Sequence, residues 1–201
     1  MDIKTIKTKE DLKNLFDFFV DVFKLDAEEY NEKFYDMTER YKTMEKQFDA
    51  DNEFIMYIKD NDKIIAGITG SNMNNDKITL SILGVDKKYR NNGLAKKLIL
   101  EFEKRCKEKG VCNIDLGARK RAVKLYSDLG YSYSLLVQVT NDKIDEIRFN
   151  NKYNLKEKRS YKSNSYSYVI YDVNDIDNKY IDNFINKIDG CFAQYMFEKR
   201  L

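Results

Sequence analysis

The sequence contains no histidine, tryptophan or proline, and the missing histidine excludes the most mechanisms. Without an imidazole no Ser–His or Cys–His pair can form, so nucleophilic catalysis through such a dyad is ruled out. The three cysteines, Cys106, Cys112 and Cys191, form no CxxC pair. A zinc site would then need cysteine and carboxylate ligands alone. We therefore expect no metal centre and, in a cytosolic chain, no structural disulfide.

Long apolar runs and a surplus of one charge are also missing. No stretch can span a bilayer, and the start, MDIKTIKTKEDL, has no apolar signal-peptide core. The chain has 36 Lys and Arg against 34 Asp and Glu, which gives no general attraction to nucleic acid or anionic lipid. We expect a cytoplasmic protein with neither partner, and the Asn, Lys and Ile content is typical of an AT-rich bacterial genome.

What is present is a regular alternation of helix and strand patterns in the first half. Residues 2–7 alternate as a strand does, and a helix follows with Thr8 as its N-cap. A second helix is expected from Ala27 to Phe48. Alternation then predicts a hairpin over residues 53–73, followed by a third strand, KITLSILGV, at 77–85.

The second half repeats strand–helix–strand units. A helix from Leu94 ends at Gly110, and a short helix over 121–130 lies between strands at 112–118 and 131–139. The order β-α-α-β-β-β-α-β-α-β predicts an α/β (or α+β) fold in a single domain, 1–201. We expect a mixed, mostly antiparallel twisted sheet of about seven strands, with helices on both faces and parallel pairing at the strand–helix–strand units.

Residues 141–190 form a lengthened, less regular C-terminal region. We expect 141–149 to extend a hairpin, 150–165 to be a polar loop, 166–173 a strand and 175–188 an amphipathic helix, before a closing strand at 191–201. Three interpretations of this region stay open: it forms a lid on the acceptor side, it supplies a strand to a dimer, or it is plain structural elaboration.

The turn VDKKYRNNGLA, residues 85–95, stands out because a helix start normally favours acids. Five cations lie in or beside it: Lys87, Lys88, Arg90, Lys96 and Lys97. A helix N-terminus after a strand, with a glycine in the turn, is an anion site. Gly93 lets an oxygen approach the backbone, and Arg90 offers a bidentate fork. The alternative is that the lysines are only solvated on the outer face of the helix.

Two motifs resemble the GNAT superfamily of N-acetyltransferases. Arg90-Asn91-Asn92-Gly93-Leu94-Ala95 is similar to its pyrophosphate loop, R/Q-x-x-G-x-G/A, and follows the strand-ending Val85. RAVKLYSDLGY resembles its later signature A-x-x-L-Y-x-x-x-G-[FY], through Ala122, Leu125, Tyr126, Gly130 and Tyr131. The strong part of the match covers about 53–135. Lys87 replaces a frequent proline, and Arg119 replaces an asparagine that bonds the pantetheine arm in many members.

The resemblance implies acetyl-CoA, or another acyl-CoA, as co-substrate. Its pyrophosphate would lie on the backbone of residues 90–95, and its pantetheine arm would pair with Leu83, Gly84 and Val85. Gly84 inside an apolar strand indicates a bulge or a close backbone approach, or a glycine that relieves crowding under a helix. Tyr126 is the implied general acid for the CoA thiolate, the alternative being a packing residue.

The acceptor implied by the resemblance is a primary amine of a small molecule or protein, which attacks directly in a ternary complex. Freeing a lysine-like amine at pH 7 costs roughly 4–5 kcal/mol, so a base must take the proton. Glu53 and Asp115 are candidates, and either also fits a solvated strand end or a salt bridge. Glu32, Asp36 and Glu39 form a helical stripe for a cationic acceptor, or a solvated face.

A second function stays open beside the enzyme. A catalytically inactive acyl-CoA-binding regulatory module is compatible with the missing base and with Arg119. A nucleic-acid protein using the cations of 87–97 lacks a second basic patch with interleaved aromatic residues. The chain is expected to be a monomer or a homodimer.

Overall fold

The computed structural model describes residues 1–30, 36–71, 73–74, 76–118 and 120–201. The chain forms two compact units. We call residues 1–114 with 200–201 the N-terminal unit and residues 115–199 the C-terminal unit, and each is described by itself.

Four antiparallel strands form the sheet of the N-terminal unit. They are β1 (Ile3–Thr5), β2 (Ile55–Asp60), β3 (Lys63–Ser71) and β4 (Lys77–Val85), adjacent in that order. The β2–β3 turn takes Asn61 into the left-handed region, with φ 51°, which asparagine tolerates better than most residues. This arrangement confirms the predicted hairpin and third strand.

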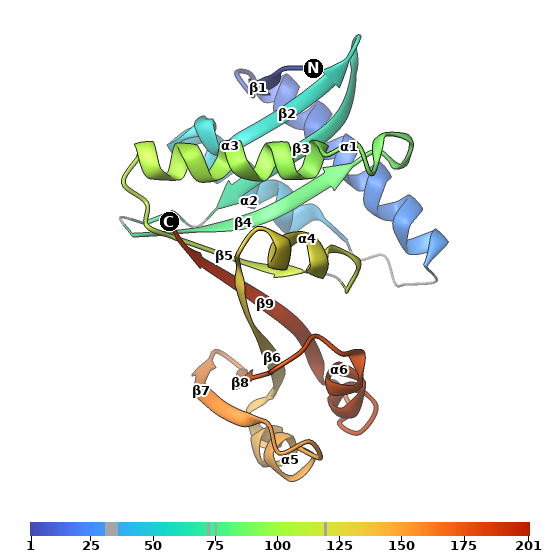
Figure 1. The fold of residues 1–201 in the computed structure, drawn as a ribbon, viewed down its shortest axis with the longest axis vertical. Helices are drawn as coiled ribbons and strands as arrows, with labels where there is room; N and C mark the ends of the chain where they lie inside the picture. The colour runs from blue at the N-terminus through green and yellow to red at the C-terminus, as the bar shows by residue number, and fades with distance from the viewer. Residues whose placement is uncertain (31–35, 72, 75, 119) are drawn as a thin grey trace. The chain divides into compact units, whose positions relative to one another are not determined.

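Helices cover both faces of these strands, as Figure 1 shows for α3 on one side and α1 and α2 on the other. They are α1 (Lys9–Glu29), α2 (Thr38–Ala50) and α3 (Leu94–Glu108). Two glycines of β3 lie under these helices, one on each face of the sheet. A Cβ on Gly67 would lie 2.5 Å from Leu15 of α1, and one on Gly70 would lie 3.0 Å from Phe102 of α3. The helices therefore lie close against the sheet because these positions have no side chain.

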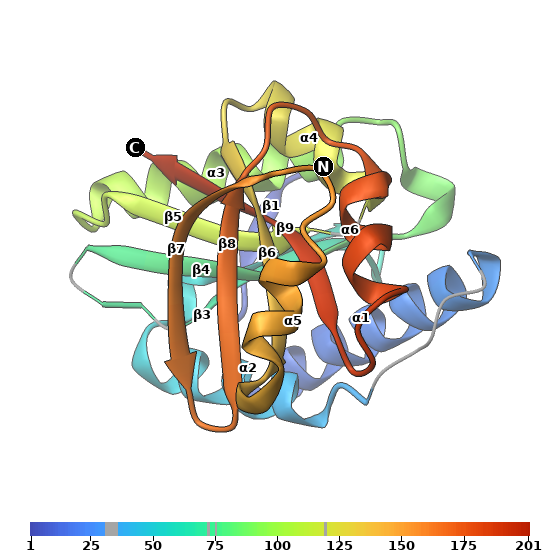
Figure 2. The ribbon, with the colours of Figure 1, turned by 90° about the horizontal axis from the view of Figure 1, so that it is seen from below.

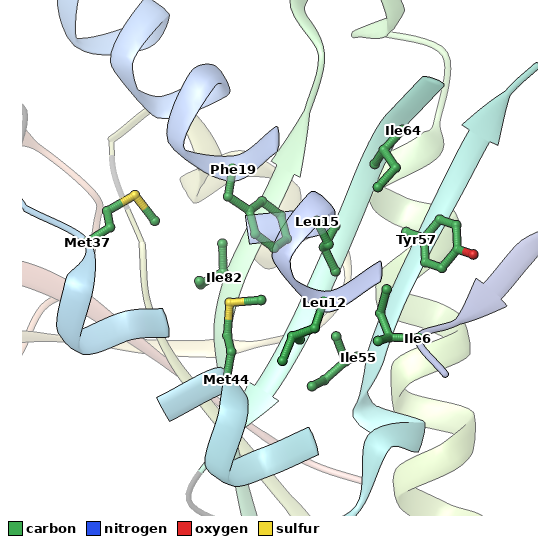
Figure 3. Close-up of a cluster of buried hydrophobic side chains, with 10 residues drawn as sticks. All are labelled: Ile6, Leu12, Leu15, Phe19, Met37, Met44, Ile55, Tyr57, Ile64 and Ile82. Carbon is green, nitrogen blue, oxygen red and sulfur yellow. The ribbon is translucent and has the colours of Figure 1, made fainter. Parts of the chain in front are cut away.

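The core of this unit lies between the strands and the pair α1 and α2 (Figure 3). Its members are Ile6, Leu12, Leu15, Phe19, Met37, Met44, Ile55, Tyr57, Ile64 and Ile82. The sequence predicted α1 and its N-cap, and the cap is as expected, since the Asp11 N–H donates to Thr8 Oγ1 over 3.0 Å.

A β-bulge interrupts β4, and it lies at Ser81 rather than at Gly84. Thr69 pairs with Ile82 and Gly70 with Leu80, which leaves Ser81 as the extra residue. Gly84 keeps regular pairing, and a Cβ there would lie 3.0 Å from the Phe19 ring of α1. Gly84 therefore relieves crowding under a helix, which was the alternative interpretation of this glycine.

The C-terminal unit holds the remaining strands in the order β5-β9-β6-β8-β7. Its elements are β5 (Asn113–Ala118, which begins in the N-terminal unit), α4 (Val123–Asp128), β6 (Ser132–Thr140), α5 (Ile144–Phe149), β7 (Lys156–Ser163), β8 (Tyr166–Asp172), α6 (Asn178–Ile185) and β9 (Phe192–Arg200). β6 pairs antiparallel with both β8 and β9. Figure 2 shows β7 and β8 as a hairpin. The predicted parallel β5–β6 pair is wrong, because β9 lies between them.

The described residues confirm a mixed α/β fold with nine strands rather than about seven. Three segments differ from prediction. Residues 27–29 end α1, and α2 begins only at Thr38. Asp36 Oδ1 accepts from the Thr38 N–H at 2.9 Å, and this local bond competes with continuing the helix.

In the C-terminal unit, residues 144–149 form α5 around the buried Ile147, where the extension of a hairpin was predicted. Residues 156–163 form β7, whose side chains are all exposed and so show no apolar alternation.

None of the helices in the described ranges combines the length and apolar character needed to cross a membrane.

Candidate functional site

The turn after β4 starts at Asp86, whose carboxylate fixes the first residues. Asp86 Oδ1 accepts from the Lys88 N–H at 3.0 Å, and Oδ2 accepts from Lys63 Nζ at 2.6 Å. Partial burial acts to raise the pKa of Asp86, but the hydrogen bonds from Lys63 and from the Lys88 N–H outweigh it and lower the pKa. Asp86 therefore stays ionised at neutral pH, and the turn leaves the sheet in a fixed direction.

The guanidinium of Arg90 clamps this turn to the rest of the unit. Nε donates to the Val85 carbonyl at 3.1 Å, and Nη2 donates to Asp26 Oδ1 at 2.7 Å. Asp26 lies near the end of α1 and is 4% exposed. The predicted bidentate fork of Arg90 is thus directed at protein groups, which makes the residue a support of the turn. Asp26, an acid on the buried side of an amphipathic helix, was missed by sequence reasoning.

Beyond the clamp, the backbone presents open donors at the N-terminus of α3. Asn91 and Gly93 both have positive φ, 64° and 75°. The Lys97 N–H makes the first bond of the helix, to the Gly93 carbonyl at 2.9 Å, so the N–H groups of residues 94–96 precede the helical ladder. No side chain caps α3 and its first turn has no acid. A Cβ on Gly93 would meet nothing within 4 Å, so an anion can approach these donors.

The five cations around the turn divide into two groups. Three are engaged: Lys87 pairs with Glu29 at 3.1 Å, Arg90 with Asp26, and Lys97 donates to the Met1 carbonyl. Lys88 and Lys96 are exposed, and within the described part of the chain neither makes an ion pair. The positive potential at the α3 N-terminus therefore comes from the helix together with two lysines that face solvent.

The strand end Leu83–Val85 leads directly into this turn. It pairs with β3 along one edge, with Leu83 opposite Ile68 and Val85 opposite Ala66. The structure thus brings all nine predicted cofactor-binding residues, 83–85 and 90–95, into one continuous strand end, turn and helix start within a single unit. Their contact with a cofactor stays a prediction.

Tyr126 lies in the C-terminal unit, on α4. It is 4% exposed, and its ring centroid lies 5.6 Å from that of Tyr131 and 5.4 Å from that of Phe197. Burial raises the pKa of Tyr126. The side chain therefore packs among aromatic rings and keeps its proton at neutral pH, which any general acid must do.

The acidic residues considered for the acceptor side are mostly engaged locally. Glu53 lies 3.5 Å from Lys109 Nζ, and Glu39 accepts from Lys42 Nζ at 2.6 Å. Asp36 accepts from Thr38, while Asp115 lies half-buried on β5. Glu32 and Arg119 lie outside the described residues. No base is singled out by these contacts.

Comparison with known families gives the class of this protein. The model of the acetyltransferase (GNAT) domain matches residues 21–148, which is more than half of the chain. The chain belongs to the GNAT acetyltransferase family, as the two motifs indicated. No curated protein sequence matches it.

Several solved structures share the fold. The acetyltransferase of the GNAT family from Staphylococcus aureus Mu50 is 21% identical, with 84% of this chain and 99% of that chain covered and a TM-score of 0.53. An acetyltransferase from Streptococcus agalactiae 2603 is 17% identical, with 84% and 96% covered and a TM-score of 0.54. The ribosomal-protein-S18-alanine N-acetyltransferase from Escherichia coli is 15% identical, with 85% and 90% covered and a TM-score of 0.50. At these identities the likeness shows the fold alone.

Proposed function

We propose that the protein is an acetyl-CoA-dependent N-acetyltransferase, which transfers the acetyl group to a primary amine of a small molecule or protein in a ternary complex. The observation that carries this proposal is the open N-terminus of α3 at Gly93, one turn after the end of β4, in a member of the GNAT family. The Asn- and Lys-rich composition supports a bacterial source, and we further propose a cytoplasmic location.

On the donor side, the chain's own backbone supplies the recognition. The N–H groups around residues 91–95 donate to the pyrophosphate, and Lys88 and Lys96 add charge at its edge. The strand end Leu83–Val85 aligns the pantetheine arm, and a backbone N–H there polarises the thioester carbonyl and stabilises the oxyanion. Arg90 positions the donor site and is not itself a ligand of the pyrophosphate, because its guanidinium holds Val85 and the turn together.

On the leaving-group side, Tyr126 is the proposed general acid. The amine forms the new C–N bond as the C–S bond breaks, the phenol gives its proton to the sulfur, and the amine proton leaves to a base or to water. Glu53 and Asp115 stay the candidate bases. Since burial raises the pKa of Tyr126, a rate loss from its ionisation is expected only at strongly alkaline pH.

An amine-panel screen tests this function. The purified protein is given acetyl-CoA and each amine, thiol release is followed, and the acetylated product is identified by mass. We expect amine-dependent thiol release with at least one acceptor. Tight acetyl-CoA binding without release for any amine would contradict the enzyme and leave an acyl-CoA-binding module. Steeply salt-dependent binding of RNA or DNA would contradict both.

A further inference from the structure

A small pocket lies between α2 and the strands β3 and β4, wholly within the N-terminal unit. Its volume is about 200 Å³, several times the ~30 Å³ that one water occupies in the liquid. It is lined by Arg40, Thr43, Met44, Thr69, Gly70, Ser71, Thr79, Ser81 and Ile82. The space suits one end of a small molecule.

The lining has an unusual chemical bias. Five of its nine residues carry a hydroxyl group, one is an arginine and none is acidic. The hydroxyl groups can donate as well as accept hydrogen bonds, and the guanidinium is a cation that only donates, so the pocket favours an anionic group such as a carboxylate. An ammonium group would find no counter-charge among these residues, and the lining therefore does not fit the amine itself.

One hydroxyl in this lining is buried without a partner. Thr69 is 0% exposed, and within the described part of the chain its Oγ1 makes no hydrogen bond. Leaving such a group unsatisfied costs about 1–3 kcal/mol, so native structures rarely keep one without a reason. Beside it the Oγ atoms of Ser71 and Ser81 are in direct hydrogen-bond contact, Ser81 Oγ donates to the Thr79 carbonyl at 3.5 Å, and Ser71 is 2% exposed. A ligand oxygen that enters the pocket would meet the unpartnered hydroxyl of Thr69, held in place beside this serine pair.

The bulge at Ser81 accounts for the shape of the pocket. As the extra residue of β4, Ser81 turns its carbonyl toward α2, where it accepts from Arg40 Nη1 at 3.0 Å. This bond holds the exposed guanidinium of Arg40 beside the buried hydroxyls. The bulge, the buried Thr69 and Arg40 thus form one built arrangement across three elements.

We propose that this pocket binds the carboxylate of the acceptor, and that the acceptors are small amines carrying a carboxylate at the far end. This inference rests on the proposed function. Ser81 and the strand end at Leu83–Gly84 are two to three residues apart, which is ~7–10 Å along a strand. The separation fits an ω-amino carboxylate better than an α-amino acid, whose two groups are adjacent.

Three amines of equal length test the proposal: 6-aminohexanoate, its carboxamide and hexylamine. We expect kcat/KM for 6-aminohexanoate to exceed that for the other two by at least tenfold. Arg40→Gln and Thr69→Val are each expected to reduce this preference to less than threefold while the KM for acetyl-CoA stays unchanged. Lys46→Gln, an exposed cation of the same helix outside the pocket, is the matched control and should keep the preference.

Thr69→Val also separates binding from folding. Valine has the same shape and removes the unpaired hydroxyl, so the variant should be at least as stable as the wild type. A stability gain with the carboxylate preference intact would make the hydroxyl a packing defect and overturn the proposal.

The outcomes distinguish this inference from the function it rests on. If the three amines react equally, the pocket assignment is wrong and the acetyltransferase stands. If no amine releases thiol, calorimetric titration with hexanoate decides: binding by the wild type that Arg40→Gln abolishes supports the pocket without the enzyme. No hexanoate binding would overturn the pocket as well.

Discussion

Substituting alanine for Gly93 places one methyl group at the open N-terminus of α3. Gly93 has φ 75°, a left-handed conformation that costs an L-residue roughly 1–2 kcal/mol. No atom lies within 4 Å of the added Cβ, so no clash adds to this cost. For a chain of this size, the melting temperature should fall by about 2–8 °C.

The affinity for acetyl-CoA should fall by more than the backbone cost explains. The methyl group occupies the space through which a phosphate oxygen reaches the N–H groups of residues 94–96. Loss of one charge-assisted hydrogen bond is worth about 1.5–3 kcal/mol, or roughly a 10–150-fold weaker Kd. The KM for the amine should stay unchanged, because the substitution acts on the donor side.

Gly110 provides the matched control at the other end of α3. Its φ is 74°, and a Cβ there also meets nothing within 4 Å. Gly110→Ala should therefore lose similar stability and keep wild-type affinity for acetyl-CoA. The assays are thermal unfolding and calorimetric titration of both variants. If Gly93→Ala binds acetyl-CoA as tightly as Gly110→Ala, the assignment of the anion site is refuted.

Three further predictions follow from single residues. Tyr126→Phe should lower kcat at saturating acetyl-CoA by about 10²–10⁴-fold, and unchanged turnover would leave Tyr126 a packing residue. Arg90→Lys should lower the free energy of unfolding by roughly 1–3 kcal/mol in urea, because one ammonium cannot replace both bonds of the fork; an unchanged midpoint would contradict the clamp. Burial raises the pKa of Cys106 to about 12 and of Cys191 to about 11, so at neutral pH Ellman's reagent should label the exposed Cys112 alone. Fast labelling that persists in Cys112→Ser would contradict this.

Strongly periodic segments of the fold were predictable from the sequence. The α1 stripe, the β2–β3–β4 meander and α3 each bury one regular face, so spacing alone indicates them. β7 was missed because all its side chains are exposed and only backbone pairing with β8 defines it. The start of α2 was missed because the local bond from the Thr38 N–H to Asp36, which competes with a continuing helix, is not indicated by helical spacing.

The candidate site was predictable to a similar extent, because sequence indicates neighbouring residues but not partners that lie far apart in the chain. Local sequence sufficed to predict the open turn at Gly93, since this glycine and the flanking strand and helix are contiguous, while anion binding there stays a prediction. The role of Arg90 was not predictable, because its partner Asp26 lies 64 positions away. The bulge at Ser81 likewise becomes visible only when the register of β4 against its partner β3 is known. The sequence alone therefore does not indicate the hydroxyl-lined pocket that this bulge shapes.

The most direct test of the donor site compares two thioesters on the wild-type protein by calorimetric titration. Acetyl-CoA and acetyl-pantetheine share the reacting arm, and only the first carries the pyrophosphate, together with the 3′-phosphoadenosine attached to it. Two or more charge-assisted hydrogen bonds to the turn predict acetyl-CoA binding tighter by roughly 100-fold or more. Equal affinities would contradict the claim that residues 90–95 bind the pyrophosphate of an acyl-CoA donor.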